Sequence, residues 1–122
     1  MSFLLISSAE NVRFDRAAVA RTLESIPDVT NARDVQSADR YADLRWTYES
    51  AEGMIDCLLM KDGRAIEIDD ETRRACDFIL NFARQWPASL DLINDDYSLH
   101  LSLAGFRDID ELWNSINAAY EA

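Results

Sequence analysis

The amino-acid sequence predicts a single α+β domain, with a mixed or mainly antiparallel sheet of about five or six strands and three helices. Two observations support this fold class. Apolar and polar residues alternate over several short segments, and three longer segments repeat apolar residues at helical spacing. The expected order is β-α-β-β-β-β-α-β-β-α. A length of 122 residues fits one domain over residues 1–122, and 48% apolar residues are sufficient for a core.

The first half contains a strand at Phe3–Ser7, a helix at Asp15–Ile26, a weaker strand at Val29–Val35, an overlapping flexible loop at Asn31–Tyr41 and a strand at Tyr41–Glu49. Asp15 is a suitable N-cap, because a carboxylate can accept hydrogen bonds from the free backbone N–H groups of the first turn. In the strand Tyr41–Glu49, alternation places Leu44, Trp46 and Tyr48 on one side.

The second half contains strands at Met54–Met60 and Ala65–Ile68, a helix from Asp69 to Trp86, strands at Leu90–Ile93 and Leu99–Leu103, and a helix at Asp108–Tyr120. Asp62-Gly63 between two apolar runs predicts a hairpin with a type I′ turn, in which both central residues have positive φ. The acids Asp69–Glu71 are expected to cap the helix that runs from Asp69 to Trp86. Asp108 and Glu111 have the spacing of a capping box.

The sequence favours a cytoplasmic protein. The N-terminal apolar stretch Phe3–Ile6 is short and has no positive residue before it, unlike a secretory signal. No apolar run approaches the roughly 20 residues that span a bilayer. Cys57 and Cys76 lie in apolar contexts, which predicts two buried thiols in a reducing compartment.

The composition excludes several classes of function. With 12 Lys and Arg against 23 Asp and Glu, the net charge is −11, which argues against binding to nucleic acid or to an anionic membrane. Three glycines leave no room for a phosphate-binding loop, and one histidine with two distant cysteines does not fit a zinc site. We therefore expect no cofactor, no metal and no catalytic residue. A lone residue such as His100 is more often structural than catalytic.

The acidic residues are concentrated in two regions. Residues 49–71 hold eight acids against Lys61 and Arg64, and residues 91–122 hold seven acids against Arg107. Residues 1–48 are nearly balanced, with seven acids and six arginines. Two interpretations remain open: an acidic surface that keeps the protein in solution, or a surface that steers a cationic partner.

Large aromatic side chains near these acids predict a protein-binding surface, because aromatic residues inside a polar rim are typical of binding hot spots. The candidate partner-binding residues are Trp46, Tyr48, Glu49, Glu52, Asp56, Asp62, Asp95, Asp96 and Tyr97. For Trp46 the clean strand alternation equally favours a place in the core. For Asp95 and Asp96 the alternative is a structural role in a turn.

Three features carry a family resemblance: the acid-rich hairpin Glu49–Glu71, the strand that enters an acidic turn at Leu90–Tyr97, and the acidic helix start Asp108–Leu112. In these features the chain resembles the small acidic α+β immunity proteins of bacterial polymorphic-toxin and contact-dependent inhibition systems. The resemblance implies a stoichiometric inhibitor of a basic toxin, for example a nuclease. The alternatives are a homodimeric structural or regulatory domain, and a small ligand-binding domain or enzyme.

Overall fold

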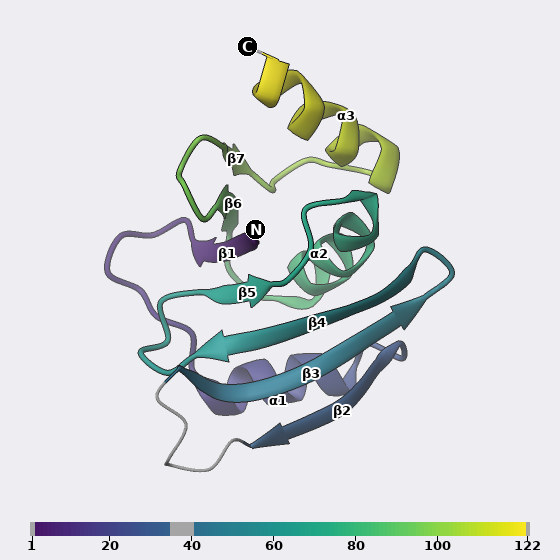
Figure 1. The fold of residues 1–122 in the computed structure, drawn as a ribbon. Coiled ribbons are helices and arrows are strands. Elements are labelled where there is room, and N and C mark those ends of the chain that lie inside the picture. Colours follow the sequence, from purple (N-terminus) through teal and green to yellow (C-terminus); the bar gives the residue numbers. More distant parts are fainter. Residues whose placement is uncertain (1, 35–40, 122) are drawn as a thin grey trace.

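The structure is a computed structural model that describes residues 2–34 and 41–121. The described residues form seven strands and three helices in the predicted order (Figure 1). The elements are β1 Phe3–Ser7, α1 Arg16–Glu24, β2 Val29–Asp34, β3 Ala42–Ser50, β4 Gly53–Met60, β5 Ile66–Ile68, α2 Arg73–Gln85, β6 Leu90–Asn94, β7 His100–Ser102 and α3 Ile109–Glu121.

All seven strands belong to one antiparallel sheet in the order β2-β3-β4-β5-β1-β6-β7. The α+β class is therefore confirmed, and the sheet is larger than the five or six strands expected. The N-terminal strand β1 lies between β5 and β6, with Leu5 opposite Ile66 on one side and Leu92 on the other. This insertion joins the two hairpin regions into one continuous sheet.

Helices α1 and α2 lie behind the sheet in the view of Figure 1, and α3 packs against α2. The core fills the space between the sheet and these helices. Phe78 of α2 is central to it, with its ring centroid 6.0 Å from that of Trp46 and 5.3 Å from that of Tyr48. The burial of each such large apolar side chain contributes about 1.5–3 kcal/mol to the stability of the fold. The opposite face of the sheet has no helix packed against it in this view.

Two of the three predicted helix starts are confirmed. Asp15 accepts a hydrogen bond from the Ala18 backbone N–H at 3.0 Å, and Asp108 accepts one from the Glu111 N–H at 2.9 Å. The predicted start of the long helix at Asp69 is wrong, because α2 begins only at Arg73. Asp70 instead accepts from the Thr72 backbone N–H at 2.6 Å, so the acids belong to the turn before the helix.

The predicted type I′ turn between β4 and β5 is also wrong. Within this turn only Gly63 has positive φ, at 73°. The connection has five residues, Lys61–Ala65, and inside it the Gly63 N–H donates a hydrogen bond to the Met60 carbonyl at 2.9 Å. A Cβ atom at Gly63 would lie 3.0 Å from the Phe14 carbonyl oxygen, so glycine is required here for space as well as for φ.

Cys57 and Cys76 are buried and form no disulfide, as predicted. Burial raises the pKa of both thiols, that of Cys76 to about 12. The loop expected at Asn31–Tyr41 is strand β2 up to Asp34, and residues 35–40 lie outside the described part of the chain.

Among the described helices, none has an apolar stretch long enough to cross a lipid bilayer.

Candidate functional site

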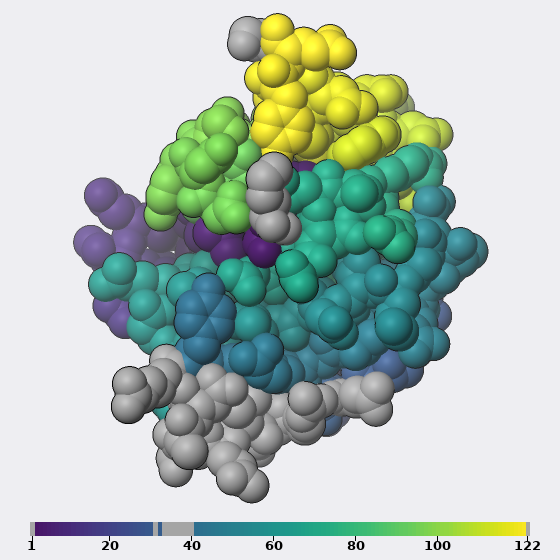
Figure 2. Space-filling model, viewed as in Figure 1, coloured from purple at the N-terminus to yellow at the C-terminus, as the bar shows by residue number. Residues whose placement is uncertain are grey.

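The sheet face turned away from α1 and α2 is the candidate site, and we call it the open face. Strand alternation brings every second side chain to it. Register pairs place one row of side chains across six neighbouring strands, from β3 to β7: Arg45, Leu58, Glu67, Leu4, Ile93 and His100. The view of Figure 2 looks onto this face. Charged and apolar side chains are thus interleaved on a surface that no described helix covers.

The open face contains an acidic pocket of about 310 Å³, lined by the carboxylates of Asp56, Glu67 and Asp69. Asp56 and Asp69 are neighbours, because the Asp69 backbone N–H donates to the Asp56 carbonyl at 2.9 Å. The Thr47 hydroxyl donates to Asp56 at 3.2 Å, and the Tyr41 hydroxyl donates to Glu67 at 2.9 Å. The bond to Glu67 raises the pKa of Tyr41. Arg45 lines the same pocket, so three carboxylates outnumber one guanidinium, and the remaining negative charge favours a cationic side chain.

Beside this pocket lies a groove of about 520 Å³ whose apolar lining includes Leu4, Ile6 and Ile93, and we call it the apolar groove. Charged residues of both signs also line it: Glu10, Arg13, Asp62 and Arg64. Leu4 is the register partner of Glu67, so the groove and the acidic pocket adjoin. Leu4 and Ile6 are only half-buried, although strand β1 lies in the middle of the sheet. Apolar side chains left accessible beside carboxylates are typical of a protein-binding surface.

Tyr97 lines the same groove and has two unusual properties. Its side chain is 75% exposed, and its backbone has a φ of 60°. The left-handed region costs a residue with a side chain about 1–2 kcal/mol, and glycine adopts it freely. A tyrosine at this position therefore makes the fold less stable than a glycine would. Such strain is often found at functional positions.

His100, Asp91 and Ser8 form a hydrogen-bonded group at the outer part of the open face. His100 Nε2 lies 2.7 Å from Asp91 Oδ2, and the Ser8 hydroxyl donates to Asp91 Oδ1 at 2.7 Å. Burial raises the pKa of Asp91, but the two hydrogen bonds outweigh it and the pKa is lowered. The serine contacts the aspartate and not the histidine, so this is not the arrangement that activates a serine nucleophile.

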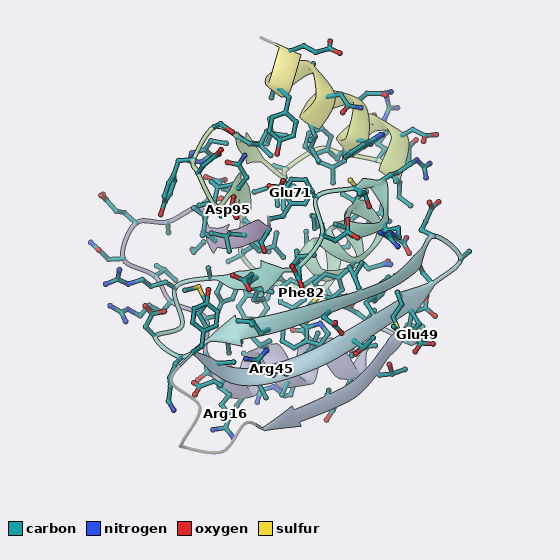
Figure 3. The ribbon with its side chains drawn as sticks, in the orientation of Figure 1. Arg16, Arg45, Glu49, Glu71, Phe82 and Asp95 are labelled. Carbon is teal, nitrogen blue, oxygen red and sulfur yellow. The ribbon has the colours of Figure 1, made fainter. Side chains whose placement is uncertain are left out.

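A second group of acids surrounds the β6–β7 turn, where Figure 3 shows Glu71 beside Asp95. Burial, together with the charge of Asp95, raises the pKa of Glu71. Asp95 accepts from the Ser2 backbone N–H at 3.2 Å. Asp96 accepts from the Ser98 N–H at 3.0 Å, and its bonds to Ser98 lower its pKa. Both turn carboxylates therefore have structural partners. No group of three metal-binding side chains occurs among the described residues.

The prediction that Trp46 and Tyr48 contact a partner is wrong. They are only 2% and 1% exposed, because their side of β3 is the one that α2 covers. Alternation identified their shared side correctly, and the core interpretation of Trp46 is the right one.

The other predicted partner-binding residues are dispersed. Glu49 is exposed near the end of β3 (Figure 3). Glu52 forms an ion pair with Arg73 at 2.7 Å, and Asp62 forms one with Arg64 at 3.4 Å. Asp56 lines the acidic pocket, and Asp62 and Tyr97 line the apolar groove. The structure therefore brings together only part of the predicted set.

Sequence reasoning missed Glu67, Asp69, Leu4 and Ile6 as members of the site. A signal for the apolar pair was present, because Phe3–Ile6 is apolar without interruption and such a strand has apolar side chains on both faces. A signal for Glu67 was its place between Ile66 and Ile68 in the hairpin.

The open face is thus the candidate site that the described residues support best. Comparisons with protein families, with curated proteins and with solved structures found no match to this chain.

Proposed function

We propose that this chain is a binding domain that neutralises a basic protein by stoichiometric contact through the open face. One observation carries the proposal: the acidic pocket at Asp56, Glu67 and Asp69 adjoins the apolar groove at Leu4 and Ile6, on a face that no helix of the described residues covers. The net charge of −11 favours a partner with positive charge.

The two parts of the surface have different physical roles. The carboxylates attract a cationic partner and orient it, which raises the association rate. The apolar groove and the exposed ring of Tyr97 supply contact area that excludes water, which slows dissociation. An inhibitor that works by occupying its target needs no catalytic group. A basic toxin such as a nuclease is the partner class that fits, because its own site must bind anionic substrate.

The buried thiols of Cys57 and Cys76 support a place in a reducing compartment, such as the bacterial cytoplasm. There an immunity protein would meet a toxin that enters or is made in the same cell.

The proposal is tested by affinity capture from the source cell with the tagged chain and two variants. Asp56→Asn/Glu67→Gln removes two charges from the acidic pocket and keeps the shape of both side chains. The control Asp110→Asn/Glu121→Gln removes two charges from exposed positions on α3. All three proteins are eluted with rising salt, which weakens contacts between exposed charges.

We expect the unmodified chain and the control to recover one basic protein in stoichiometric amount. The pocket variant should recover about tenfold less, the effect of losing about 1.4 kcal/mol of binding. Equal recovery by the pocket variant would contradict a role for the open face. Recovery of no basic protein by any of the three would contradict the proposed partner class.

A further inference from the structure

We infer that a second surface, formed by α1 and the edge strand β2, binds a second copy of this chain. Strand β2 is the last strand on its side of the sheet, and α1 packs beside it, behind β3 in the view of Figure 1. Alternate residues of an antiparallel edge strand direct their backbone N–H and C=O groups away from the sheet. Such an edge can pair with another strand.

An apolar groove of about 430 Å³ runs between α1 and β2. Its apolar lining residues are Ala20, Leu23, Ile26, Pro27, Val29, Ala32 and Leu44. Ala20 and Val29 are half-buried, and Pro27 and Ala32 are exposed. Leu23, Ile26 and Leu44 are buried beneath them. A neighbouring subunit on this groove would remove the accessible apolar surface from water.

The outer side of α1 has small side chains that permit close approach. Ala17 and Ala20 are three residues apart and Glu24 follows one turn later, so all three share one side of the helix. An alanine surface lets two helices pack at short interaxial distance. A second α1 is thus a sterically suitable occupant of this side.

The charges on α1 make this surface complementary to itself. Arg21 and Glu24 are both exposed, and within the described part of the chain neither forms an ion pair. Two copies of α1 that pack antiparallel about a two-fold axis bring Arg21 of each copy to Glu24 of the other. An interface between identical subunits requires this kind of self-complementarity.

The distribution of charge over the whole chain also favours α1 and β2 as the surface between two copies. Residues 1–48 have seven acids and six arginines, whereas the remaining residues carry almost all of the net charge of −11. Two copies that met through the acidic regions would repel each other. Contact through α1 and β2 keeps those regions apart and leaves the open face accessible.

The register of β2 shifts between Thr30 and Arg33. Such irregularities shorten the stretch over which an edge can pair. The new strand pairing is therefore short, and the helix contacts and the apolar groove provide most of the interface.

The test is a charge exchange, followed by sedimentation equilibrium over a range of protein concentrations. Arg21→Glu and Glu24→Arg each place like charges opposite each other twice in the dimer. The double variant Arg21→Glu/Glu24→Arg restores both pairs. Arg64→Glu, at the exposed β4–β5 turn, is the control with the same change in net charge as Arg21→Glu. All three substituted positions are exposed, and the circular dichroism spectrum verifies that each of the four variants is folded.

We expect a concentration-dependent dimer whose dissociation constant rises about tenfold in each α1 single variant and returns toward the original value in the double variant. The control should leave it unchanged. A monomer at every concentration, or single variants with an unaltered dissociation constant, would overturn the inference. So would failure of the double variant to restore association. The inference does not depend on the proposed function, because the measurement uses the purified chain alone.

Discussion

The Tyr48 hydroxyl donates a hydrogen bond to Asp77 Oδ2 at 2.8 Å and accepts one from Asn81 Nδ2, also at 2.8 Å. This connection joins β3 to α2 across the core. It explains why a tyrosine can occupy a fully buried strand position, because its one polar atom is satisfied. The same contact fixes the orientation of β3. The alternate side chains of this strand, including Arg45, therefore lie on the open face.

Replacing Tyr48 by phenylalanine should lower the free energy of unfolding by about 1–3 kcal/mol, because Asp77 and Asn81 lose a buried partner. Chemical denaturation measures this change. Tyr97→Phe is the matched control, since Tyr97 is 75% exposed. A Tyr48→Phe variant as stable as the original would show that the hydrogen bonds contribute nothing.

Stability should fall as the pH rises above about 10. Burial, followed by the hydrogen bond to Asp77, raises the pKa of Tyr48 above its usual value of 10.0. Above that pH the unfolded chain releases the phenolic proton and the folded chain keeps it, so the free energy of unfolding decreases. Below that pH the contribution is fully present. Denaturation across this range should show a shallower decline for Tyr48→Phe, and identical slopes would contradict the assignment.

Tyr97→Gly should stabilise the fold by about 0.5–1 kcal/mol, because relief of the left-handed strain exceeds the entropic cost of glycine. It should also weaken partner binding, because the exposed ring is lost. Tyr97→Ala separates the two effects, since it removes the ring and keeps the strained backbone. Partner binding unaltered by both substitutions would remove Tyr97 from the interface.

Gly63→Ala should destabilise the protein more than Gly105→Ala. Both glycines have positive φ, 73° and 92°, so both substitutions strain the backbone. Only at Gly63 would the new Cβ lie close to backbone, 3.0 Å from the Phe14 carbonyl oxygen, whereas nothing lies within 4 Å at Gly105. We expect a difference of about 1 kcal/mol from this crowding. Equal melting temperatures would contradict it.

The order of the elements could be predicted because periodicity is a local property of the chain. The strand Phe3–Ser7 and the shared side of Leu44, Trp46 and Tyr48 follow directly from it. The start of α2 could not be predicted, because Asp70 accepts from the nearby Thr72 N–H, and acids in a turn resemble acids at a helix N-terminus.

The candidate site was harder to predict, because it depends on which face of the sheet the helices cover. Tyr48 was expected at the surface and is buried, whereas Glu67 reaches the open face from a strand of only three residues. Leu4 adjoins Glu67 only because β1 pairs with β5, a contact between residues far apart in the sequence. Local patterns contain no information on such pairings.

The role of the open face is tested most directly by calorimetric titration of the captured basic protein into the unmodified chain and the two charge variants. We expect one partner per chain, weaker binding for Asp56→Asn/Glu67→Gln by about tenfold, and unchanged binding for Asp110→Asn/Glu121→Gln. Equal affinity for all three proteins, or the same loss in both variants, would show that the acidic pocket does not bind the partner.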